Sequence, residues 1–133
     1  MNEIFRNVIF TLNNWTEDDV RVMSGIVDIV VNTRKPFKYV IFQKEVAPTT
    51  GTPHLQGYIQ LNKQMRKRAL IAINPTFMKC SFHRADNAEK SIAYCQKTGP
   101  GRRVDGTNVY EFGARKAQGT RNDIGSIRKA ISF

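Results

Sequence analysis

The chain has few cysteines, no long apolar runs and few acidic residues, and each of these features limits the classes of protein to which it can belong. Its 133 residues include two cysteines, which are too few for a disulfide framework and suit a reducing compartment. No segment approaches the roughly 18 consecutive apolar residues of a membrane span. The opening residues MNEIFRNVIF carry charge where a signal peptide needs an apolar stretch. We therefore expect neither a membrane partner nor a secretory signal.

The scarcity of acidic residues leaves a strongly basic chain. Asp and Glu number 11 against 21 Lys and Arg, which gives a formal net charge of +10. The length corresponds to one domain, and a hydrophobic content of 41% is enough for a core. An excess of positive charge this large on one domain favours a polyanionic partner, with nucleic acid ahead of a membrane surface.

Strand-like and helix-like patterns alternate along the chain. The first helix is expected to start at Thr16, because TEDD offers an N-cap followed by acids in the first turn. We predict helices from 16 toward 31, over 63–73 and over 85–97, and strands over 7–12, 37–46, 54–61, 77–84 and 108–113. Together these elements imply an α+β fold, in which helices pack on a central antiparallel sheet of about five strands.

The segment GTPHLQGYIQL contains the first candidate site. Side chains two residues apart on a strand share a face, so His54 and Gln56 would project together. A hairpin with the preceding strand would bring Glu45 across from His54. One imidazole, one amide and one carboxylate suit Mg²⁺ or Mn²⁺, with positions left open for water and phosphate oxygens. The alternative is a structural histidine that is held by hydrogen bonds.

A second metal site can be drawn from Cys80, His83 and Cys95. Thiolate and imidazole are the ligands that zinc prefers. The spacings of these three residues match no zinc-finger pattern, however. We therefore expect no zinc there.

The segment KSIAYCQK contains the second candidate site. Lys90, Tyr94 and Lys97 share one face of the predicted helix. A phenol is a poor nucleophile at pH 7 unless cations or a base assist it, and flanking ammonium groups could do so while gripping a phosphate. The alternative is a buried aromatic ring between two solvated lysines. Tyr58 shares a strand face with Gln56 but lacks flanking lysines, so we expect it to pack or to contact a base.

Three motifs in order carry a family resemblance. FTLNN, PHLQGYIQ and YCQK resemble the three motifs of circovirus-like replication initiators (Rep proteins), which are HUH endonucleases of small circular single-stranded DNA viruses. The resemblance implies a metal held by His54 and Gln56 of the second motif, with Glu45 from the preceding strand. It makes Tyr94 the nucleophile, and Lys97 would either orient the phosphate or assist the leaving group.

The resemblance also implies an activity and a domain plan. Such a protein nicks and rejoins the stem-loop of a single-stranded origin through a 5′-phosphotyrosine link, using Mn²⁺ or Mg²⁺, to start rolling-circle replication. Residues 1–115 would form the HUH endonuclease domain, and 116–133 a basic extension leading toward a helicase domain. The chain contains no GxxxxGK[ST] phosphate loop, so we expect the nuclease domain alone. Oligomerisation is expected only in the full-length form, and the host nucleus is the expected compartment.

Basic and aromatic residues are expected to bind the DNA. Phosphate contacts would come from basic clusters, and base stacking from exposed rings. Trp15 would serve either as a stacking platform or as a core residue. The candidate DNA-binding residues are Asn13, Asn14, Trp15, Lys63, Arg66, Lys67, Arg68, Lys90, Arg115 and Lys116.

A non-catalytic function is the main alternative. A basic sheet with helices packed on it also describes the RRM type of single-stranded nucleic-acid-binding module. That module carries K/R-G-F/Y-G/A-F-V-x-F/Y on a central strand. The sequence contains no such motif, and the proposed metal ligands and Tyr94 would have no purpose in it.

Overall fold

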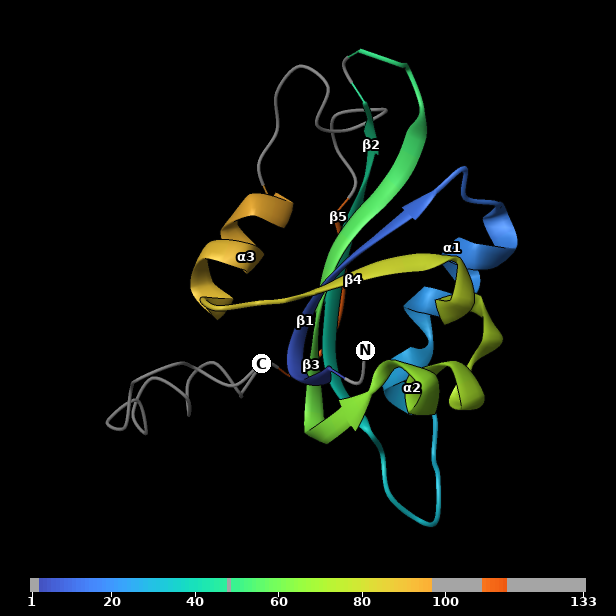
Figure 1. Ribbon diagram of the computed structural model, residues 1–133, viewed down its shortest axis with the longest axis vertical. Coiled ribbons are helices and arrows are strands. Elements are labelled where there is room, and N and C mark those ends of the chain that lie inside the picture. The colour runs from blue at the N-terminus through green and yellow to red at the C-terminus, as the bar shows by residue number, and fades with distance from the viewer. Residues whose placement is uncertain (1–2, 48, 97–108, 115–133) are drawn as a thin grey trace.

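A five-stranded antiparallel sheet forms the framework of the protein (Figure 1). The computed structural model describes residues 3–47, 49–96 and 109–114. Within them the strand order is β4-β1-β3-β2-β5, so β3 lies at the centre. The predicted α+β class is confirmed. The strands are β1 (Ile4–Asn13), β2 (Phe37–Val46), β3 (Pro53–Arg66), β4 (Cys80–Arg84) and β5 (Val109–Gly113).

Different helices cover the two faces of the sheet. One face packs against α1 (Glu17–Ser24), α2 (Lys67–Ile73) and two 3₁₀ turns, η1 (Ile26–Asp28) and η2 (Pro75–Lys79). The opposite face is covered by α3 (Ala88–Gln96). Figure 1 shows α3 on one side of the sheet, with α1 and α2 on the other. None of the helices in the described part of the chain is long and apolar enough to cross a membrane.

The larger core lies on the face covered by α1 and α2. Its sheet side chains include Phe10, Phe42 and Leu55, all fully buried. Gly57 lies among them on β3. A methyl group there would stand 2.5 Å from the ring carbon Cζ of Phe10 and 2.7 Å from Cβ of Phe42. The two rings therefore pack across the central strand because residue 57 has no side chain.

The smaller core lies under α3. It joins Tyr39, Ile41 and Tyr58 of the sheet to Ile92 and Cys95 of the helix. Tyr58 is fully buried, so its predicted packing role is the one that the structure supports. At the end of the sheet where β2 turns into β3, this face carries the buried polar side chains of Gln43 and Glu45.

The predicted helix over 63–73 is wrong in its first turn. Residues 63–66 continue β3, where Arg66 pairs with Ile4 of β1, and α2 begins only at Lys67. The pairing of β1 with β3 shifts register between Asn7 and Phe5, after which Met65 pairs with Phe5. Helical spacing within the segment was overridden by this tertiary pairing.

Two other predicted boundaries are also wrong. The helix expected from Thr16 toward Val31 ends at Ser24, where Gly25 caps it and η1 follows. The strand expected from Phe77 begins at Cys80, because the Asn74 side chain accepts a hydrogen bond from the Thr76 N–H and caps η2. A short helical turn thus replaces the first part of the strand.

The start of α1 is confirmed. Thr16 and Asp19 form a reciprocal capping box, with bonds of 3.0 and 3.1 Å. Lys79 of η2 donates to both oxygens of Asp19, at 2.8 and 2.9 Å. Burial by itself would raise the pKa of Asp19, but the bonds from Lys79 and Thr16 outweigh it and leave the pKa lowered. The carboxylate therefore links α1 to η2 in its charged form.

Candidate active site

The β2–β3 hairpin places the predicted metal ligands on the face covered by α3. Glu45 pairs directly with His54 across the two strands, as the sequence predicts. Gln56 lies two residues further along β3, opposite Gln43 on one side and Thr11 of β1 on the other. The three candidate ligands therefore occupy adjacent positions on two paired strands.

Glu45 and His54 are in direct contact. The distance from His54 Nε2 to Glu45 Oε1 is 3.1 Å, and the Glu45 residue is 4% exposed. A carboxylate buried to this degree is stable only with polar partners. Its second oxygen, Oε2, accepts a bond of 2.8 Å from the Gln43 amide. Each oxygen of the Glu45 carboxylate therefore has a polar partner.

Gln56 is oriented by a neighbour that the sequence analysis did not single out. The Thr11 hydroxyl donates to the side-chain oxygen of Gln56 at 2.9 Å. An amide oxygen has two lone pairs, so this bond leaves one for a further ligand. Thr11 lies within the FTLNN motif, but its partner becomes evident only from the pairing of β1 with β3.

The donor set fits a hard divalent cation. Adjacent ligands of an octahedral Mg²⁺ at 2.0–2.1 Å lie about 3.0 Å apart, close to the 3.1 Å between Glu45 Oε1 and His54 Nε2. Gln56 on the same face would add the amide oxygen. Among the described residues no three His, Cys, Asp or Glu side chains gather to hold a metal. The candidate set therefore depends on the amide as its third member.

The zinc hypothesis for Cys80, His83 and Cys95 is excluded by the fold. Cys80 belongs to the core under α1 and α2, whereas Cys95 belongs to the core under α3. The sheet separates the two thiols. Burial, with the charge of Glu45 adding to it, raises the pKa of Cys95 to about 12. The Cys95 thiol therefore stays protonated near Tyr94 and does not compete as a nucleophile.

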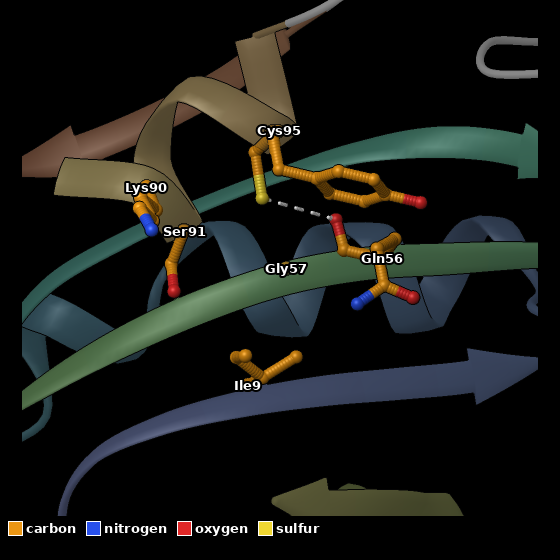
Figure 2. A pocket seen from close by; sticks show the side chains of 7 residues that line it. Ile9, Gln56, Gly57, Lys90, Ser91 and Cys95 are labelled. Carbon is orange, nitrogen blue, oxygen red and sulfur yellow. Dashed lines mark hydrogen bonds between the residues drawn. The ribbon is translucent and has the colours of Figure 1, made fainter. Parts of the chain in front are cut away.

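Tyr94 lines a pocket between α3 and the sheet. The pocket has a volume of about 350 Å³, and its lining includes Gln56 and Lys90. Figure 2 shows Ser91 and Cys95 pointing from α3 toward β3, with Lys90 on the same helix. Cys95 fixes this part of the helix, because its thiol donates to the Gln56 carbonyl oxygen at 3.8 Å. The predicted nucleophile and a predicted metal ligand thus share one cavity.

The first-motif residues lie at the same end of the sheet. Asn13 is exposed and pairs with His54, while the Asn14 N–H donates to the Pro53 carbonyl oxygen at 2.7 Å. Trp15 is partly buried and packs against the larger core, with the Lys44 ammonium 4.6 Å from its ring centre. The packing shows a contribution of Trp15 to the core, and its role as a stacking platform stays a prediction.

The basic cluster over 63–68 does not line the pocket. Lys63 and Arg66 lie toward the far end of β3, roughly 30 and 40 Å along the strand from His54 at about 3.3 Å per residue. Arg68 is exposed on α2. Lys67 donates to the Cys80 carbonyl oxygen at 3.0 Å and lies over the Phe82 ring, and its contact with DNA stays a prediction. Lys90 is the predicted DNA-binding lysine that lines the pocket.

Several predictions fall outside the described residues. They are Lys97, Arg115, Lys116 and the basic extension over 116–133.

The second residue that the sequence analysis missed is Gln43. Glu45 is two residues along the same strand, but the bond to Tyr94 could not be predicted from local sequence, because Tyr94 lies on α3.

Comparison with known proteins identifies the family. The family model described as "Putative viral replication protein" matches residues 5–98. The chain is 33% identical over 137 residues to the replication-associated protein of Human associated cyclovirus 1, and 30% identical over 123 residues to that of Pigeon circovirus. These matches cover 98% and 92% of the chain. The chain therefore belongs to the family of viral replication-associated proteins, as its motifs predict.

The relatives are considerably longer than this chain. The matched region makes up 41% of the cyclovirus protein and 33% of the circovirus protein. The similarity thus concerns one part of each relative, and that part includes the hairpin and α3. A role in viral replication follows from the family.

Proposed function

We propose that this chain nicks and rejoins single-stranded DNA at a viral replication origin, with Tyr94 as the nucleophile. The observation that carries the proposal is the shared pocket of Tyr94, Lys90 and Gln56, beside the Glu45–His54 pair. A phenol, an ammonium and a set of oxygen and nitrogen donors are the groups that phosphoryl transfer to a tyrosine requires. Membership of the replication protein family supports the same activity.

The proposed reaction consists of a cleavage step and a rejoining step. The Tyr94 oxygen attacks the scissile phosphorus and loses its proton to water. The bond from phosphorus to the 3′ oxygen breaks, and that oxygen takes up a proton and leaves as a hydroxyl. Because the phosphotyrosyl bond keeps the energy of the phosphodiester, a 3′-hydroxyl can later reverse the step without ATP. The Lys90 ammonium lines the pocket in which the phosphate charge would lie.

Glu45, His54 and Gln56 would hold Mn²⁺ or Mg²⁺. When bound there, the cation would raise the electrophilicity of the phosphate and stabilise the charge that develops on it. The residues themselves keep the site polar and preformed: the hairpin sets their register, and Thr11 orients the Gln56 amide. Single-stranded origin DNA, a following helicase domain in a longer protein and action in the host nucleus belong to the same proposal.

The test of the proposal is Tyr94→Phe. This change removes one oxygen and leaves the ring, so the packing of α3 is retained. Incubation with origin DNA and Mn²⁺, followed by denaturing electrophoresis, is expected to give a covalent adduct for the wild type and none for the variant. Cleavage is expected to fall by several orders of magnitude.

Tyr58→Phe is the matched control, because Tyr58 is fully buried and should not react. An adduct formed by Tyr94→Phe but not by Tyr58→Phe would assign the reaction to the wrong tyrosine. Absence of any adduct with the wild type would favour the non-catalytic binding module instead. Binding of single-stranded DNA alone does not distinguish the two functions.

A further inference from the structure

Gln43 is a fully buried amide in the middle of the α3-facing side of β2. It lies in none of the three motifs. A buried amide is costly unless its polar atoms are hydrogen-bonded. We therefore expect the Gln43 amide to have a structural or positioning role, because an apolar side chain at this buried position would avoid the cost of desolvating an amide.

The amide nitrogen of Gln43 joins two parts of the site. It donates to Glu45 Oε2 at 2.8 Å and to the Tyr94 backbone carbonyl oxygen at 3.2 Å. An amide nitrogen has two protons and can make both bonds. One side chain thus contacts both the acid of the candidate metal site and the residue proposed as nucleophile.

Each of these bonds constrains one group of the site. Tyr94 lies in the last turn of α3, where the final four carbonyls of a helix have no partner within it. Gln43 satisfies one of them and holds the end of the helix to the sheet. On the other side, it occupies Glu45 Oε2 and leaves Oε1 facing His54 Nε2 at 3.1 Å.

We propose that Gln43 is a positioning residue that couples the metal-binding carboxylate to the helix carrying the nucleophile. The proposal rests on the function proposed above. A continuous path runs from the α3 backbone through the Gln43 amide and the Glu45 carboxylate to the His54 ring. Loss of the amide would therefore weaken metal binding and displace Tyr94 at the same time.

The chain offers a matched control in Gln60. It is also a buried glutamine facing the α3 side of the sheet, 5% exposed, and its amide donates to the Tyr58 hydroxyl at 2.9 Å. Methionine replaces glutamine with similar length and no amide. Gln43→Met and Gln60→Met each remove a buried amide, but only the first removes a bond to the site.

The experiment measures metal binding and chemistry separately. Mn²⁺ is titrated into each protein without DNA, with the free ion followed by electron paramagnetic resonance, and single-turnover cleavage is then measured at saturating Mn²⁺. We expect Gln43→Met to bind Mn²⁺ about 10-fold more weakly, the lower end of the effect of outer-shell partners. We also expect its cleavage at saturation to be about 10-fold slower. Gln60→Met should stay within about twofold of the wild type in both.

A nuclear magnetic resonance measurement on the wild type covers the case in which Gln43→Met fails to fold. Mg²⁺ is added, and the side-chain amide signals of Gln43 and Gln60 are followed. The Gln43 signals are expected to shift with occupancy, and those of Gln60 to stay in place. Unshifted Gln43 signals, or equal behaviour of the two methionine variants, would overturn the coupling while leaving the nuclease function intact. A wild type that neither binds Mn²⁺ nor cleaves would overturn both.

Discussion

Gly57→Ala tests the packing that holds the central strand under the site. The added methyl would lie 2.5 Å from Cζ of Phe10 and 2.7 Å from Cβ of Phe42, distances that a carbon atom cannot keep. Because Phe42 Cβ is fixed to its backbone and Phe10 is fully buried, the strand has to move. Overpacking of this kind costs about 1–3 kcal/mol, and we expect the upper part of that range.

A loss of about 2–3 kcal/mol corresponds to a fall in melting temperature of roughly 7–11 °C for a domain of this size. Thermal unfolding followed by circular dichroism measures it. Gly25→Ala is the control, because a methyl there would meet only backbone oxygens at 3.8 and 3.9 Å, at a φ of −103°. Both variants reduce the entropy of the unfolded chain equally, so their difference isolates the clash.

A second readout links the packing to the site. Gly57 directly follows Gln56 on β3, so a displaced strand carries the predicted ligand with it. We expect weaker Mn²⁺ binding by the folded fraction of Gly57→Ala. The reasoning is refuted if Gly57→Ala unfolds within about 0.5 kcal/mol of Gly25→Ala, the ordinary scatter of surface substitutions.

Three further predictions concern metal, salt and acid. Excess EDTA is expected to abolish DNA cleavage and Mn²⁺ or Mg²⁺ to restore it; full activity in EDTA would rule out the proposed metal site. Combined replacement of Lys63, Arg66 and Arg68 by Ala should reduce the slope of log affinity against log salt by about 2, at roughly 0.7 per phosphate contact on single strands. An unchanged slope would place this end of the molecule away from the DNA. Asp19→Asn should lower the free energy of unfolding at pH 7 by about 1–2 kcal/mol, because it weakens the capping box and the bonds from Lys79. Since the folded pKa of Asp19 is lowered from 3.8, its stabilisation is present above that pH and is lost as the pH falls through the folded value. Urea unfolding at pH 7 and pH 3 should therefore show the gap between variant and wild type narrowing in acid, and a gap that widens would contradict the assignment.

The hairpin is the part of the site that could be predicted most fully. β2 matches its predicted bounds, and the turn between β2 and β3 is short, so the pairing of Glu45 with His54 followed from local sequence. Thr11 and Gln43 could not be found in this way. Each acts on a residue of the site through a side-chain bond whose partner is set by strand order or by the docking of α3.

The basic residues illustrate the opposite outcome. Lys63, Arg66 and Arg68 form one cluster in sequence, within the helix predicted over 63–73. The structure assigns the first two to the end of β3 and the third to α2. Lys67, between them in sequence, donates a hydrogen bond to a backbone carbonyl oxygen of β4. A count of charges predicts a polyanionic partner but not the surface that meets it.

By itself, the sequence determined the class of fold, the family and the chemistry of the side chains available for a site. These depend on periodicity, on motifs and on the nature of each group, all of which are local. The tertiary structure alone decided that Tyr94 shares a pocket with Gln56 and that Cys80 and Cys95 lie on opposite faces of the sheet. Such contacts are settled by which strands pair and which face each helix buries. That choice minimises the exposed apolar surface of the whole chain, and no single segment encodes it.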